Sequence, residues 1–286
     1  MSAKQAPIFN EMMNGADVRA AYQNLEQWYR SMPAELRSLK QSEAEDLFRR
    51  VGITFAVYGE GGDPERLIPF DMFPRVLTAS EWRKLDRGIR QRAAALNAFL
   101  CDVYGRREII RAGRIPEHLV TNNEAYEKAA IGFMPPGGVF SHIVGVDLVR
   151  TGPGQFYVLE DNCRTPSGVS YMLQNREIMM RMFPQLFMEN RIAPVDGYAG
   201  LLKKTLGSVA PKKCQNEPNI VILTPGQFNS AYYEHSCRAD LMGVELVEGQ
   251  DLFVEGDFVW MKTTEGPKKV DVIYRRIDDS FLDPLC

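Results

Sequence analysis

The chain has 286 residues, of which 45% are hydrophobic and 25% are charged, and its formal net charge is −3. This length allows one large domain or two modest ones, and the charge provides no broad basic surface for nucleic acid. No apolar run is long enough to cross a bilayer, and residues 1–7 contain no apolar signal core. We therefore predict a cytoplasmic protein without nucleic-acid or membrane partners.

Apolar residues at helical spacing predict a helical amino-terminal region over residues 1–50, with a break at Pro33. A strand over 53–58 follows. A capping box at 78–81 then opens a long helix that reaches Val103. The charged residues of this helix are interpreted as its solvated face.

Residues 144–161 are predicted to form an antiparallel hairpin, because two apolar stretches flank a glycine-rich turn cluster. Three side chains with oxygen donors lie on it: Asp147, Glu160 and Asn162. Glu160 and Asn162 alternate along the second strand and therefore share a face. Asp147 joins that face in a register that sets it opposite Val158 or Glu160. Such ligands suit Mg²⁺ held with nucleotide phosphates, whereas the alternative is a strand that ends in polar turn residues.

A polar loop over 164–168 leads into a helix predicted over 171–187, whose amino end would favour an anion. Further on, a strand–helix–strand pattern over 219–247 predicts a βαβ unit with ligands at the carboxyl ends of its strands. Three polar residues follow its first strand: Gln227, Asn229 and Ser230. They either contact a ligand or form an ordinary turn with a serine cap. A last apolar strand over 270–274 ends at Arg275-Arg276.

A family resemblance rests on residues that follow one another in chain order: Asp147, Glu160-x-Asn162, Thr165 and Ser167. This order resembles the metal- and substrate-binding segment of the circularly permuted ATP-grasp ligases, which include glutathione synthetase of the eukaryotic type and glutathionylspermidine synthetase. Most of the chain after residue 50 is similar to a narrower bacterial branch, the circularly permuted ATP-grasp type 2 proteins, which are glutathionylspermidine synthase-like. Three segments carry this second likeness: Tyr58–Gly62, Ile68–Asp71 and Tyr274–Asp279.

The resemblance implies an α/β fold that contains part of a circularly permuted, glutathione synthetase-like ATP-grasp. We expect three parts along the chain. They are a helical region over 1–50, an ATP-grasp-like part with the metal and substrate hairpin over 51–206, and a βαβ substrate domain over 207–286.

The resemblance also implies roles for individual residues. Asp147, Glu160 and Asn162 fall where the family places magnesium ligands, and Thr165 and Ser167 fall where it holds the acceptor carboxylate. Arg275 or Arg276 resembles the basic residue set against the transferring phosphoryl group; strand alternation lets only one of them face a site, and the choice stays open. We add Arg164 on chemical grounds, because a guanidinium binds either a carboxylate or a phosphate, although a solvated loop arginine is the alternative.

The activity implied by the resemblance is ATP-dependent ligation of a small-molecule or peptide carboxylate to an amine through an acyl phosphate, with Mg²⁺ and ATP. Family members continue beyond the position of residue 286 with the lysines and glycine-rich flap that cover ATP, and no Walker motif replaces them here. We therefore expect a truncated ligase that depends on a separate carboxyl-terminal ATP-binding segment. The alternative is a non-catalytic peptide- or amine-binding module, or an inactive fragment; the sequence does not identify the carboxylate or the amine.

Overall fold

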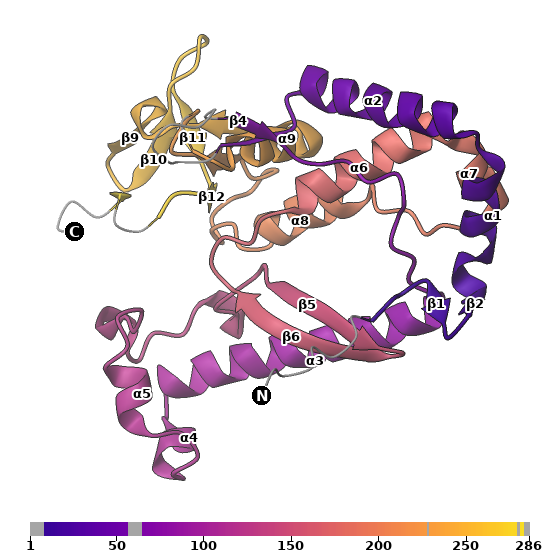
Figure 1. The fold of residues 1–286 in the computed structure, drawn as a ribbon. Helices are drawn as coiled ribbons and strands as arrows, with labels where there is room; N and C mark the ends of the chain where they lie inside the picture. The colour runs from indigo at the N-terminus through magenta and orange to yellow at the C-terminus, as the bar shows by residue number, and fades with distance from the viewer. Residues whose placement is uncertain (1–8, 57–64, 228, 279–280, 283–286) are drawn as a thin grey trace. The chain divides into compact units, whose positions relative to one another are not determined.

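The computed structural model describes residues 9–56, 65–227, 229–278 and 281–282 (Figure 1). The segment Tyr58–Gly62 and Asp279, which contribute to the family resemblance, lie outside the described residues. The chain forms two compact units: residues 1–14 with 76–166, and residues 15–75 with 167–286. Residues of the predicted range 51–206 belong to both units. The predicted domain boundaries stay a prediction. None of the described helices is both long and apolar enough to cross a membrane.

The first unit is built on one long helix and a β-hairpin. Its elements are β1 (Met13–Asn14), α3 (Ala79–Val103), α4 (Glu108–Arg111), α5 (Glu117–Thr121), η2 (Lys128–Ala130), η3 (Pro136–Gly138), β5 (Gly145–Gly152) and β6 (Gln155–Asn162). The capping box of α3 is confirmed: Thr78 Oγ1 accepts the Glu81 backbone N–H, and the Glu81 carboxylate accepts the Thr78 backbone N–H. Between residues 123 and 131 only the short 3-10 helix η2 forms.

The hairpin β5–β6 lies along α3 (Figure 1), and charged side chains fix it to the helix. Arg92 donates from Nε to both carboxylate oxygens of Asp161, at 2.7 and 2.9 Å, and Lys84 donates to the Gly154 carbonyl at 3.0 Å. The expectation that all charges of α3 form a solvated face is therefore wrong for Arg92, which is half-buried, whereas Lys84 stays exposed. A buried Arg150 on β5 completes the attachment through an ion pair with Glu81.

The second unit contains a small parallel sheet and an antiparallel one. Its elements are β2 (Asp17–Val18), η1 (Ala20–Tyr22), α1 (Gln23–Ser31), α2 (Ala34–Val51), β3 (Thr54–Ala56), β4 (Glu65–Leu67), α6 (Val169–Met182), α7 (Pro184–Glu189), α8 (Tyr198–Gly207), β7 (Ile220–Leu223), α9 (Tyr232–Met242), β8 (Glu245–Val247), η4 (Gly249–Asp251), β9 (Leu252–Glu255), β10 (Phe258–Met261), β11 (Lys268–Val270) and β12 (Val272–Arg275). β7 lies between β8 and β12 and is parallel to both. The predicted βαβ unit is thereby confirmed as β7–α9–β8.

The core of the second unit is centred on β7, whose four residues are all buried. Val221 and Leu223 pack with Val247 of β8, with Met261 of β10 and with Val270 of β11, so one apolar cluster joins the parallel sheet to the antiparallel sheet β9–β10–β11. A strand buried on both faces explains why its sequence is an uninterrupted apolar run.

The helices of the second unit differ from the prediction in two respects. The helix predicted over 171–187 is divided into α6 and α7 at Phe183, because Pro184 cannot continue the hydrogen-bond pattern of α6. Helix α8 was not predicted, although its buried residues Ala199, Leu202 and Leu206 have helical spacing.

Candidate functional site

The three predicted metal ligands lie on one face of the hairpin β5–β6. In the observed register Asp147 pairs with Glu160, and Gly145 pairs with Asn162. This is one of the two registers that the sequence predicted for Asp147, and residues paired directly across antiparallel strands share a face. Asn162 Nδ2 also donates to Glu160 Oε1 at 3.0 Å. The geometric prediction is confirmed, whereas metal binding stays a prediction.

This face of the hairpin is open and acidic. The side chains of Asp147, Glu160 and Asn162 are exposed, and among the described residues neither carboxylate forms an ion pair with a lysine or arginine. Opposed like charges on neighbouring strands are unfavourable, and a divalent cation would offset their repulsion. The donor set of two carboxylates and an amide oxygen therefore fits Mg²⁺ chemically. Groups of three or more His, Cys, Asp or Glu side chains suited to a metal do not occur in the described part of the chain, and the predicted set has only two such residues.

The opposite face of the same strands is structural. Asp161, between the two predicted ligands on β6, points to α3, and its hydrogen bond to Arg92 lowers the pKa of its carboxyl group. Cys163 follows β6, and burial, with the charge of Asp161, raises the pKa of its thiol. A raised pKa disfavours the thiolate form of Cys163.

The polar loop after β6 spans the boundary between the units. Arg164 and Thr165 are exposed in the first unit, and Ser167 is exposed in the second. Close packing fixes the loop beside the hairpin: a Cβ atom on Gly145 would lie 2.7 Å from Pro166 Cβ, so only glycine fits opposite Asn162. The loop therefore starts from a defined position next to the acidic face.

The predicted residues of the second unit lie at the carboxyl ends of β7 and β12. Gln227 is exposed, while Asn229 and Ser230 are half-buried. Asn229 Oδ1 accepts the Ala231 backbone N–H at 2.9 Å, which matches the ordinary-turn alternative for this residue. At the end of β12, Arg275 is half-buried and Arg276 is buried.

Arg276 belongs to a buried ionic cluster that was not predicted from the sequence. Glu234 on α9 is fully buried and forms ion pairs with Arg238 at 2.8 Å and with Arg276 at 3.9 Å. Both arginines also donate to the hydroxyl of Tyr274, at 3.2 Å from Arg238 and 3.4 Å from Arg276. A Glu–Arg pair four residues apart on a helix normally indicates an exposed surface, so no local pattern points to this cluster.

The same cluster explains the amino end of α6, where an anion was expected. Gly168 has φ 103° and precedes the helix, and α6 has no side-chain cap from its own start. Glu234 Oε1 instead accepts the backbone N–H groups of Gly168 at 2.8 Å and Ser170 at 3.2 Å. The anion at this helix end is thus the chain's own carboxylate.

A neutral histidine lies beside the cluster. Thr224 Oγ1 accepts the Gly226 backbone N–H at 3.2 Å and lies 2.9 Å from His235 Nδ1, so its own proton is available for the histidine nitrogen. Burial, followed by the charges of Arg276 and Arg238, lowers the pKa of His235 to about 3. His235 therefore carries no charge near neutral pH.

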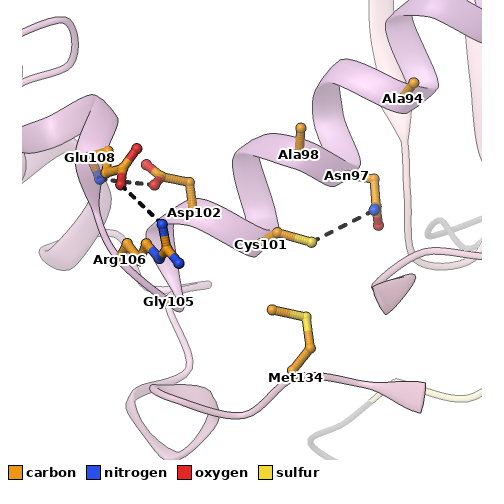
Figure 2. A pocket seen from close by; sticks show the side chains of 9 residues that line it. All are labelled: Ala94, Asn97, Ala98, Cys101, Asp102, Gly105, Arg106, Glu108 and Met134. Atoms are coloured by element: carbon orange, nitrogen blue, oxygen red, sulfur yellow. Dashed lines mark hydrogen bonds and ion pairs between the residues drawn. The ribbon is translucent and has the colours of Figure 1, made fainter. Parts of the chain in front are cut away.

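A pocket of 530 Å³ at the carboxyl end of α3 contains none of the predicted site residues (Figure 2). Its lining includes Cys101, which receives a hydrogen bond from Asn97, and Met134 (Figure 2). The carboxylate of Asp102 is engaged by the backbone N–H groups of Glu108 and Ile109. The other carboxylate of the lining, that of Glu108, lies 3.7 Å from Nη1 of Arg106, and we assign the pocket no chemistry.

Comparisons with known proteins support the family resemblance. The circularly permuted ATP-grasp type 2 family matches residues 74–286. An uncharacterized protein of Mycobacterium tuberculosis is 48% identical over 284 residues, which cover 98% of this chain and 50% of that protein. A Frankia casuarinae protein, named as a proposed glutamate–cysteine ligase, is 36% identical over 267 residues, which cover 92% of this chain and 30% of that protein.

A solved structure has the same fold. The apo form of a glutathione synthetase-like effector from Globodera pallida aligns with a TM-score of 0.55 at 14% identity, covering 88% of this chain and 60% of that chain. The fold is thus α/β and of the glutathione synthetase-like, circularly permuted ATP-grasp type. The chain spans about half the length of the mycobacterial relative. Since the family match includes the acidic hairpin, the loop after it and the parallel strands, this chain belongs to the circularly permuted ATP-grasp type 2 family.

Proposed function

We propose that this chain provides the metal- and acceptor-binding part of an ATP-dependent carboxylate–amine ligase. In this reaction ATP phosphorylates a carboxylate, and an amine then attacks the acyl phosphate and forms an amide. The single observation that carries the proposal is the direct pairing of Asp147 with Glu160 on an open face, with Asn162 beside them. Family membership supports ligase chemistry, while the activity and substrates of whole relatives remain proposals for a chain that spans part of their length.

Each group of residues has a distinct proposed task. Asp147, Glu160 and Asn162 would hold Mg²⁺, which neutralises phosphate charge when it is bound. Thr165 and Ser167 would hold the acceptor with their hydroxyl groups, and Arg164 would pair with its anionic group. An arginine at the end of β12 would stabilise the negative charge that develops on the transferring group. Loss of such a donor typically raises the barrier by about 3 kcal/mol, which is roughly a hundredfold in rate.

The substrate class follows from the resemblance and is part of the proposal. A small-molecule or peptide carboxylate is the acceptor, and an amine is the nucleophile, as in a glutathionylspermidine synthase-like reaction. Gln227 and Ser230, at the carboxyl end of β7, are the residues of the second unit that we assign to acceptor binding. Asn229 stays in this set, although its side chain already accepts a backbone hydrogen bond.

A metal titration tests the proposal without requiring turnover. Mn²⁺, which prefers the same oxygen ligands as Mg²⁺, is followed by the loss of its free electron paramagnetic resonance signal, with and without ATP. We expect the wild-type chain to bind Mn²⁺ in competition with Mg²⁺, and Glu160→Gln to weaken binding by about tenfold or more, which is about 1.4 kcal/mol. Glu124→Gln, at an exposed position of the same unit, is the matched control.

The titration also distinguishes the proposed ligase part from a non-catalytic binding module. Equal Mn²⁺ binding by Glu160→Gln and the wild type would refute the assignment of the hairpin. A chain that binds peptides or polyamines with the same affinity whether or not Mg²⁺ and ATP are present would be a non-catalytic binding module.

A further inference from the structure

One buried carboxylate, that of Glu234, contacts three segments of the second unit. Its Oε1 accepts the backbone N–H groups of Gly168 and Ser170, at 2.8 and 3.2 Å, and Nη2 of Arg238, at 2.8 Å. Its Oε2 has no hydrogen-bond partner among the described residues and lies 3.9 Å from Nη2 of Arg276. These contacts join the start of α6, the middle of α9 and the residue that follows β12.

The two oxygens of this carboxylate are used very differently. Oε1 makes three contacts of hydrogen-bond length, whereas the Oε2 contact with Arg276 exceeds that length. The strong contacts therefore hold the backbone next to Ser167 and tie it to α9. The charge of Glu234 reaches Arg276 only through a loose ion pair.

Arg276 is short of hydrogen-bond acceptors. Its side chain is 3% exposed, Nη1 donates to Tyr274 at 3.4 Å, and Nε has no partner among the described residues. A guanidinium has five N–H donors, and buried polar groups are nearly always hydrogen-bonded. An anionic ligand therefore gains more binding free energy at this buried cation than at a fully paired arginine.

The position of Arg276 in the parallel sheet is a second reason to expect a ligand beside it. The chain runs from β7 through α9 to β8 on one side, and β12 joins β7 on its other side. The carboxyl ends of β7 and β12 therefore flank a topological switch point, where ligands of open parallel sheets bind. Thr224 follows β7 at this place and Arg276 follows β12.

We propose that Glu234 is a positioning residue for an anion-binding site at this switch point: Oε1 fixes the backbone beside Ser167, and Oε2 holds Arg276 for the carboxylate or phosphate of a substrate. The inference rests on the proposed function for the identity of that substrate, and it assigns to Arg276 an anionic group distinct from the one that Arg164 would pair with. An incoming anion competes at the guanidinium with the 3.9 Å ion pair to Glu234 and with the 3.4 Å hydrogen bond to Tyr274.

A double-mutant cycle tests the positioning role. Glu234→Gln keeps an oxygen that can accept the N–H groups at the start of α6, but it removes the charge opposite Arg276. We expect an unfolding midpoint at least about 5 °C below that of the wild type, and partial recovery when Arg276→Met is added, since the unpaired cation is then removed. Glu177→Gln, at an exposed position on α6, is the matched control and should leave the midpoint unchanged.

If the effects of the Glu234 and Arg276 substitutions on the unfolding midpoint are purely additive, the proposal is overturned, because Glu234 would then serve only as a cap of α6. If Glu234→Gln does not fold, the same cycle is measured with Glu234→Asp, which keeps the charge and shortens its reach. The same additivity criterion then applies.

The anion site is tested with inorganic phosphate and with acetate in buffer free of Mg²⁺ and nucleotide. The Nε–H nuclear magnetic resonance signal of Arg276 reports binding directly. We expect a titration by at least one anion in the wild type. A response to phosphate alone identifies a phosphoryl group as the ligand of Arg276, and a response to acetate identifies a carboxylate. No response to either anion in the wild type overturns the proposal.

The two proposals fail in different ways. Mn²⁺ binding at the hairpin is measured on the same samples, and Glu234→Gln should leave it unchanged. A chain that binds no Mn²⁺ but shows the Arg276 titration loses the proposed metal site and keeps the anion site, whereas the reverse result removes only the anion site.

Discussion

The pairing of Asp147 with Glu160 predicts that a mutation in the acidic face stabilises the chain when no divalent cation is present. Side chains directly opposite on antiparallel strands have Cβ atoms about 5 Å apart. Two unit charges at this distance repel by about 0.8 kcal/mol in a dielectric near that of water, and physiological salt reduces this to about 0.4 kcal/mol. Asp147→Asn removes the repulsion and should raise the unfolding midpoint by roughly 1–2 °C in buffer with a chelator.

Added Mg²⁺ should reverse this order of stability. A cation at ten times its dissociation constant stabilises the wild type by about 1.4 kcal/mol, and Asp147→Asn lacks one of the proposed ligands. The assay is thermal unfolding by circular dichroism with EDTA and with increasing Mg²⁺, and Glu124→Gln serves as the control. If Asp147→Asn is the less stable protein in EDTA, or if Mg²⁺ stabilises both proteins equally, the acidic pair is not a cation site.

Three further predictions concern the structure around the site. Arg150→Met should lower the free energy of unfolding in urea by about 3–5 kcal/mol, because the arginine side chain is 3% exposed and its two glutamate partners lose their counter-ion. Arg87 is exposed, so the control Arg87→Met should change this free energy by less than about 0.5 kcal/mol. Because the pKa of Asp161 is lowered in the folded chain, its ionised carboxylate stabilises the fold above about pH 4, and this stabilisation is lost as the pH falls through the lowered pKa. The difference in unfolding midpoint between wild type and Asp161→Asn should therefore shrink below about pH 4. A constant difference down to pH 2 would contradict the pairing with Arg92. Gly168→Ala should cost about 1 kcal/mol or more in urea unfolding because φ is 103°, while Gly88→Ala inside α3 should gain about 0.5–1 kcal/mol, and equal effects would argue against backbone strain at Gly168.

The hairpin and the βαβ unit could be predicted from the sequence because their signals are local. A glycine-rich turn between two apolar stretches sets the hairpin, and its alternation places Asp147 and Glu160 on one face in the observed register. The uninterrupted apolar run of β7 likewise indicates a buried parallel strand. Each of these features depends on residues within a few positions of one another.

The ionic cluster could not be predicted because its members meet through tertiary structure. Glu234 reaches the backbone N–H group of Gly168 across 66 positions of the sequence, and it meets Arg276 at the end of another strand. Nothing in the local pattern distinguishes this buried Glu–Arg pair from a solvated one. Arg276 could therefore be named as a candidate, but its burial and its shortage of acceptors could not.

The sheet formed by β5 and β6 has only two strands in the part of the chain that is described, so each strand has one edge that faces no other strand there. Open edges are templates for intermolecular pairing, and Tyr157 and Leu159, which are 59% and 70% exposed, add an apolar surface beside them. Concentrated samples should therefore self-associate through this ribbon, and a lysine in place of Leu159 offers a route to crystals or spectra of the unassociated protein.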